Sequence, residues 1–252
     1  PYLLTELIGC FDPDSDTFQP MPMHEMIDQK LGRLPDDAER LLDVIAVSGQ
    51  ALSMDEASRT AGHELLPVST ITRMRTERLV RLIGPDENQL VDTYHDRIRE
   101  TVVAEMEDVS RKATHRALAE VIEADVGGVS DEQIATLESS AAGSETDELT
   151  AIPRVYDLAY HFDAAGYDRK AWVYGLLAAE QARRQFAVEV ATNQYAIAKR
   201  NASQTTDAVR YRIASGNGRA LNLLGRYGEA ADELEGTIDL TDDSVEKARI
   251  EW

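Results

Sequence analysis

His95 and Asp96 are the residues whose types and position in this sequence best suit chemistry. They stand between an apolar, strand-like segment and a helical pattern. A structural role explains part of the pair, because Thr93 could cap the helix and Asp96, three residues on, could complete a capping box. That role leaves His95 unexplained, since a charged imidazole near a helix N-terminus is mildly disfavoured. We therefore keep both as candidate functional residues, with helix capping as the competing interpretation.

The second candidate group is four arginines that lie close together in the sequence: Arg73, Arg75, Arg78 and Arg81. They lie on and just after a predicted helix, and in a DNA-binding protein such a helix could enter the major groove and neutralise several phosphates. Glu77 interrupts the run, and the formal net charge of −20 should repel nucleic acid. Solvated helix charges, or contacts with another domain, are the competing interpretations. DNA is therefore kept as an alternative partner and not as the expected one.

No other residues form a recognisable site. The histidines lack the spacing of metal ligands: His24, His63, His95, His115 and His161. Cys10 has no partner pattern for nucleophilic catalysis, and acidic residues are too abundant for one pair to stand out as acid and base. The sequence also lacks a Gly-rich phosphate loop with Lys and Ser or Thr. We therefore expect no metal site, and we expect this chain by itself not to be an enzyme.

Composition places these candidates in a mainly α protein. The chain has 252 residues, of which 43% are hydrophobic and 6% aromatic, and it is rich in residues that favour helix over sheet. Its length suits one or two domains. The single cysteine fits a reducing compartment. There is neither a signal-peptide pattern nor an apolar run long enough to cross a membrane. We therefore expect a cytoplasmic protein with no membrane partner.

The elements around His95 predict a winged-helix domain over residues 35–125. Three short helices and then two strands are expected: 35–49, 53–62, 68–79, 80–83 and 89–91. Ser53 and Glu56 form a capping-box pattern at the second helix. A polar turn joins the two strands and indicates a small β-hairpin. From His95 on, apolar residues recur at helical spacing, which predicts one closing helix of about thirty residues.

Beyond this domain the chain changes character twice. Residues 126–151 are predicted to be an acidic flexible linker, because Gly, Ser, Thr, Asp and Glu dominate there without any Lys or Arg between Gly127 and Thr150. Residues 152–252 are predicted to form an α-solenoid of helical hairpins. The segments 166–171 and 225–230 carry the same turn signal, with a Gly five residues before an Ala and an aromatic residue between them.

The later of these hairpins resembles a tetratricopeptide repeat. Its matching residues are Ala214, Gly218, Leu221, Gly225, Tyr227, Ala230 and Leu234. Small residues at such positions let paired helices approach closely. In the earlier copy, Gly175 stands where that repeat has a large residue. The helical pattern is still running at Trp252 and the chain opens on Pro1 inside an apolar run, so we expect a truncated array in a piece of a larger protein.

Four segments, taken in order, resemble the signalling ATPases of the STAND class, relatives of the AAA+ ATPases. Residues 94–100 are similar to the His-Asp signature that closes the winged-helix domain of that class. Residues 1–7 resemble the start of its lid helix, residues 34–49 its first winged-helix segment, and residues 159–166 the entry to its repeats. The similarity is greatest to the ATPase modules fused to bacterial serine/threonine kinases, nucleotide cyclases and transcription regulators.

This resemblance implies roles for particular residues. It would make residues 1–34 the lid segment of an ATPase core that lies outside this chain, with Pro1 packing on the adenine of bound ADP. His95 would contact the β-phosphate, and Asp96 would orient His95 or its helix. Tyr94 stands where plant and animal members have Met. The resemblance implies no cofactor for this chain itself, and ATP or ADP with Mg²⁺ for the parent protein. A serine/threonine kinase or a cyclase could be the fused effector, which the resemblance does not identify.

The function predicted on this basis is regulatory. A winged helix would help to hold ADP against the ATPase core, and a protein partner on the repeats would bias its release. Two alternatives remain open: a DNA-binding transcription regulator that uses the four arginines, and a plain scaffold in which the winged helix serves only packing.

Overall fold

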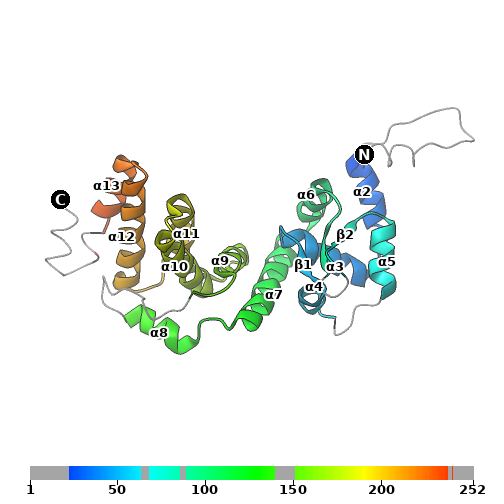
Figure 1. Cartoon of the computed structure of the whole chain (residues 1–252), viewed down its shortest axis with the longest axis horizontal. Helices are drawn as coiled ribbons and strands as arrows, with labels where there is room; N and C mark the ends of the chain where they lie inside the picture. Colours follow the sequence, from blue (N-terminus) through cyan, green and yellow to red (C-terminus); the bar gives the residue numbers. More distant parts are fainter. Residues whose placement is uncertain (1–22, 64–67, 86–88, 140–150, 238–239, 241–252) are drawn as a thin grey trace, which may run out of the picture. The chain divides into compact units, whose positions relative to one another are not determined.

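The computed structural model describes residues 23–63, 68–85, 89–139, 151–237 and 240 (Figure 1). The described chain is mainly α-helical, with one small three-stranded antiparallel sheet in its N-terminal part. It divides into two compact units, and the division falls between Thr114 and His115, inside helix α7 (Asp108–Val126). The predictions for Pro1, for the lid over residues 1–22, and for residues 140–150 and 241–252 lie outside the described residues.

Unit 1 opens with short helices whose bounds follow the predicted ones closely: α2 (Met23–Leu31), α3 (Asp36–Val47), α4 (Met54–Thr60) and α5 (Val68–Thr76). Helix α3 forms the centre of the core, because Leu41 and Ile45 on its apolar face are fully buried. It packs against α4, α5 and α6. The predicted capping box at α4 is confirmed, since the Ser53 hydroxyl accepts from the Glu56 amide while the Glu56 carboxylate accepts from the Ser53 amide.

The sheet of unit 1 contains the predicted hairpin and one further strand. Strands β2 (Val80–Ile83) and β3 (Leu90–Thr93) pair antiparallel, with Val80 opposite Thr93. The two-residue strand β1 (Leu52–Ser53) pairs with the other edge of β3, so the strand order is β1-β3-β2. The sequence did not indicate β1, because a strand this short depends on its partner for its hydrogen bonds.

The prediction of one long closing helix after His95 is wrong. Helix α6 (Asp96–Glu105) ends at Met106, whose ψ of 132° is extended, and α7 begins at Asp108. The Asp108 carboxylate accepts from Arg111 and Lys112 of its own first turn, and an acidic residue suits a helix N-terminus. After this break, Val109 in the first turn of α7 is 78% exposed, although it is apolar.

The described part of unit 2 consists of consecutive helices that pack in pairs after α7: α8 (Asp131–Ser139), α9 (Val155–Ala164), α10 (Asp168–Arg184), α11 (Val188–Asn201), α12 (Asp207–Leu223) and α13 (Tyr227–Glu235). Helix α8 corrects the prediction of a flexible linker over residues 126–151. It forms because Ile134 and Leu137 are buried, and it packs against α12. The composition of the segment did not indicate this helix, because the two apolar residues lie among many acidic ones.

The predicted turns at Gly166 and Gly225 are confirmed. Both glycines have positive φ, 68° and 74°, as the left-handed end of a helix requires. In each turn the next amide closes a bond to the preceding helix: Tyr167 N to Phe162 O at 2.9 Å, and Arg226 N to Leu221 O at 3.0 Å. Phe186, between α10 and α11, takes the same conformation with φ 60° although it is not glycine, and no local signal predicted that turn.

Gly175 has a packing reason that the repeat pattern could not supply. A Cβ atom at Gly175 would lie 2.8 Å from the backbone nitrogen of Ala198, because α10 and α11 approach closely there. We expect Gly175→Ala to lower the free energy of unfolding by about 1–3 kcal/mol, although Ala is normally the better helix former. Urea denaturation followed by circular dichroism measures this.

The matched control is Gly228→Ala in α13, where an added Cβ would meet no atom within 4 Å. That substitution should leave stability unchanged or raise it by up to about 1 kcal/mol. Equal stability of the Gly175→Ala variant and the wild type would contradict the close approach of α10 and α11.

Candidate functional site

His95 lies at the corner between β3 and α6 and is itself the N-cap of α6. Its backbone is extended, and its side-chain Nδ1 accepts a hydrogen bond of 3.1 Å from the amide of Arg97. The predicted capping by Thr93 is wrong, because Thr93 is the buried last residue of β3. A ring nitrogen that accepts carries no proton, so the cap uses a neutral imidazole and the objection to a charged histidine at this position does not apply.

A buried carboxylate holds this corner in place. Asp92, 7% exposed in β3, accepts a hydrogen bond of 2.7 Å from Arg81 of β2 and another of 2.7 Å from Arg99 of α6. Arg99 also contacts Asp96 at 3.2 Å. Because Asp92 joins both strands of the hairpin to the helix, it fixes the direction in which α6 starts. Sequence reasoning missed Asp92, since its two partners lie on other elements, β2 and α6.

The corner presents polar groups on its outer side. Tyr94, His95 and Asp96 are exposed, and they precede the first turn of α6, whose amides carry partial positive charge. Such a helix end attracts anions. His95 and Asp96 are therefore together and accessible, whereas Pro1 lies outside the described residues. Among the described residues no group of three or more His, Cys, Asp or Glu side chains could hold a metal ion.

The four arginines do not form a single helix face. Arg73 and Arg75 are exposed on α5, and Arg73 donates to the carbonyl of Arg33 at 2.7 Å. Arg78 follows the end of α5 with a positive φ of 56°, and Arg81 lies on β2 paired with Asp92. A nucleic acid would therefore meet two exposed helix arginines, with the charge of Arg81 already offset by a carboxylate.

Unit 2 contains a pair of buried histidines that the sequence did not bring together. His115 of α7 and His161 of α9 are 5% and 2% exposed, and their Nδ1 atoms are 2.9 Å apart. Tyr160 packs edge-on against both rings. Burial, and then the neighbouring His115, lowers the pKa of His161 to about 3. One Nδ1 must donate and the other accept, and the lowered pKa keeps His161 neutral, so the contact ties α7 to α9.

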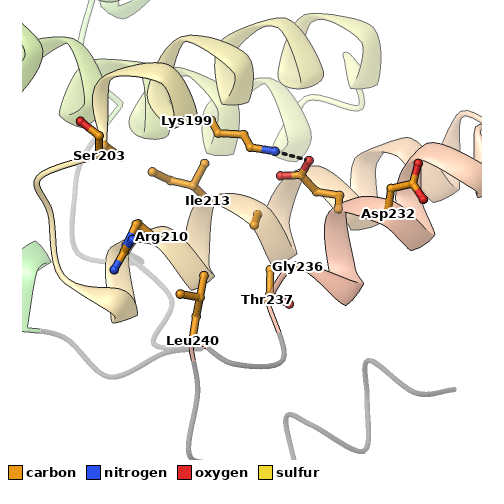
Figure 2. Close-up of a pocket in the computed structure, with 11 residues that line it drawn as sticks. Lys199, Ser203, Arg210, Ile213, Asp232, Gly236, Thr237 and Leu240 are labelled. Carbon is orange, nitrogen blue, oxygen red and sulfur yellow. Dashed lines mark hydrogen bonds and ion pairs between the residues drawn. The ribbon is translucent and has the colours of Figure 1, made fainter.

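Two clefts lie among α11, α12 and α13. The first has a volume of about 260 Å³ and is lined by apolar Ile213 and Leu240 together with polar groups; Lys199 donates to Glu233 across 2.7 Å (Figure 2). The second, of about 380 Å³, is mainly polar, and Glu233 lines it as well. Both clefts contain acidic side chains, and only the second also contains side-chain amides, those of Asn193 and Asn217.

Comparisons with known proteins found no similar protein. No protein-family model matches the chain, no curated protein matches its sequence, and no solved structure matches its fold. In the described part of the chain, no helix combines the length and apolar content needed to span a bilayer. The functional conclusion therefore depends on the residues of the corner and the clefts.

Proposed function

We propose that this chain is a cytoplasmic, non-catalytic regulatory module of a STAND-type signalling ATPase. Unit 1 is a winged helix that contacts bound ADP through His95, and unit 2 is a tetratricopeptide-like array that binds a protein partner. The observation that carries the proposal is the exposed His95, held at the N-terminus of α6 by the buried Asp92.

Two features support the winged helix. The order helix, short strand, two helices and hairpin, from α3 to β3, is the order of a winged helix. The short strand β1 also completes the three-stranded sheet that such a domain has. The array is supported by the packing of consecutive helices in pairs, by the glycine turns at 166 and 225, and by small residues at close helix contacts.

The nucleotide role follows from charge and position. A phosphate that approached the start of α6 would meet the positive end of the helix and an imidazole beside it. ADP would then link the winged helix to the ATPase core, and a partner on unit 2 would shift the balance between closed and open states. Mg²⁺, ATP hydrolysis and any kinase or cyclase activity would belong to other parts of the parent protein.

The DNA-binding alternative has less support, because Arg81 is paired with Asp92 and only Arg73 and Arg75 are exposed on α5. The plain scaffold is the stronger rival. It assigns His95 only the capping bond to Arg97. The two hypotheses therefore differ in what a substitution of His95 does to nucleotide affinity.

The test compares His95→Ala with His95→Asn in the parent protein that includes its ATPase core. Asn is a good N-cap, so it keeps the bond to the Arg97 amide and removes only the imidazole. We expect both variants to bind ADP at least tenfold more weakly, about 1.4 kcal/mol, because both lose the phosphate contact. Isothermal titration calorimetry measures the affinity.

Stability separates the capping role from this contact. His95→Ala should also lower the free energy of unfolding of the 252-residue chain by about 1 kcal/mol, whereas His95→Asn should not. If His95→Asn binds ADP as tightly as the wild type, the phosphate role is refuted and His95 is only a helix cap.

A further inference from the structure

The polar cleft of about 380 Å³ carries more negative than positive charge. Its lining comes from three helices: Thr192, Asn193, Ala196, Asn217, Leu221, Arg226, Glu229, Asp232 and Glu233. The one cation of this lining is already engaged, because Arg226 donates to both oxygens of Glu229 at 2.7 and 2.5 Å. Asp232 makes no ion pair within the described residues. The cleft therefore offers carboxylate charge to a ligand.

Two buried oxygen atoms in the lining lack donors. The side chain of Glu233 is 10% exposed, and its Oε2 accepts from Lys199 while Oε1 has no hydrogen-bond partner among the described residues. Oδ1 of Asn217, on α12, is likewise buried without a partner in the described part of the chain. Buried acceptors without donors cost free energy, so a ligand that brings N–H groups to both oxygens would be stabilised.

We infer that this cleft binds an arginine side chain of a basic segment in the protein partner. A guanidinium carries five N–H donors in a planar fork and keeps its charge at every physiological pH. It would place its charge among the carboxylates of Glu229, Asp232 and Glu233 and bring N–H donors to the cleft that Asn217 also lines. The inference rests on the proposed role of unit 2 as a partner-binding array and names the chemistry of that partner.

The chemistry of the cleft excludes other small ligands of its size. An anion would meet the carboxylate of Asp232, two further carboxylates that are already paired, and no cation that is free to bind it. A divalent metal ion has no group of three suitable ligands among the described residues. An apolar side chain would leave the two buried oxygens without donors. A cationic donor is the ligand that satisfies both the charge and the hydrogen bonds.

The test titrates the isotope-labelled 252-residue chain with the peptide Ac-Ala-Ala-Arg-Ala-Ala-amide and follows backbone amide shifts by NMR. The matched probe replaces the arginine by citrulline, which has the same shape and no charge. We expect shifts at Asn193, Asn217 and Asp232, with a dissociation constant on the order of 1 mM. The citrulline peptide should bind at least tenfold more weakly.

Three variants locate the interaction. Asp232→Asn and Glu233→Gln should each weaken the arginine peptide severalfold, and Asp232→Asn does so without touching the Lys199–Glu233 ion pair. Glu132→Gln removes one negative charge from the exposed side of α8 and should change nothing. Circular dichroism checks that every variant is folded.

The outcomes separate this inference from the proposed function. If Glu132→Gln weakens binding of the arginine peptide as much as Asp232→Asn does, the affinity depends on the total charge of the chain. That result would refute the cleft as the binding site and indicate nonspecific attraction. Absence of shifts at the cleft with the arginine peptide would overturn it too. Shifts confined to another face of unit 2 would reject the cleft and leave the partner-binding role of the array intact. The His95 measurement is independent of either result.

Discussion

Glu180→Ala is expected to lower the free energy of unfolding by about 3–5 kcal/mol, the effect of leaving a buried charge without its partner. Glu180 of α10 and Arg212 of α12 form an ion pair in which Nε and Nη2 of Arg212 both lie 2.9 Å from Oε1 of Glu180. Their side chains are only 11% and 10% exposed. Removing the carboxylate would leave the charge of the guanidinium in a largely buried site.

The surroundings of this pair explain why the structure cannot relax easily around the loss. Tyr195 of α11 is 2% exposed, and burial first, then the charge of Glu180, raises the pKa of its hydroxyl to about 12. A Cβ atom at Gly216 would come within 2.5 Å of the Tyr195 oxygen, so α12 is already close to that ring. The three helices α10, α11 and α12 are therefore packed around one polar centre.

The measurement uses Trp172, which is buried in α10 and reports on unit 2. In a Trp252→Phe background it is the sole tryptophan of the chain, and its fluorescence follows urea unfolding. Replacing both partners, Glu180→Leu with Arg212→Met, should recover most of the lost stability, because no charge is then left unpaired.

The control for this prediction is an exposed ion pair of unit 2. Glu120→Ala removes the partner of Arg116 on the surface of α7 and should have little effect on the urea midpoint. If Glu180→Ala proves as mild as this control, the Glu180–Arg212 pair is solvated in solution and the buried polar centre is refuted.

The parts of this fold that the sequence predicted are those with local causes. The capping box of Ser53 and Glu56 involves neighbours in one turn, and the turns at Gly166 and Gly225 need a residue that tolerates positive φ. The β-hairpin was recognisable because two apolar segments flank a polar tip. In each case the residues that form the structure are adjacent in the chain.

The parts that the sequence did not predict depend on partners in other helices or strands. Asp92 could not be recognised as the centre of the corner, because its partners Arg81 and Arg99 lie on separate elements. Glu180 looked like any other helix glutamate until α12 brought Arg212 beside it. Gly175 departs from the repeat pattern because the backbone of Ala198 lies where a side chain at position 175 would be.

Acid is expected to destabilise unit 2 through its buried histidines, well before most carboxylates titrate. The pKa of His161 is near 3 in the folded protein, because burial and the neighbouring His115 oppose a charge, and about 6.5 in the unfolded chain. Below pH 6.5 the imidazole of His161 is therefore protonated in the unfolded state but stays neutral in the folded state. The free energy of unfolding then falls as the pH falls. Between pH 7.5 and 5 we expect a loss of about 2 kcal/mol from His161 alone.

Nearby charges do not reverse this sign. Asp157 on the same helix would favour a charged His161, but it pairs with Arg154 at 2.8 Å, and Arg154 acts in the opposite direction. The double variant His115→Leu with His161→Leu removes both rings, so neither is left without a hydrogen-bond partner. It should keep nearly constant stability from pH 7.5 to 5, measured by urea unfolding followed through Trp172. His24→Gln, at an exposed position on α2, should retain the wild-type dependence.

A pH dependence that the double variant shares with the wild type would show that other groups cause it. An NMR titration of the His161 ring in the folded protein gives an independent check. A ring that stays neutral should show no chemical-shift change between pH 7.5 and 5. A midpoint near 6.5 in the folded protein would mean that water reaches the pair. The contact between α7 and α9 would then contribute less to unit 2 than its burial implies.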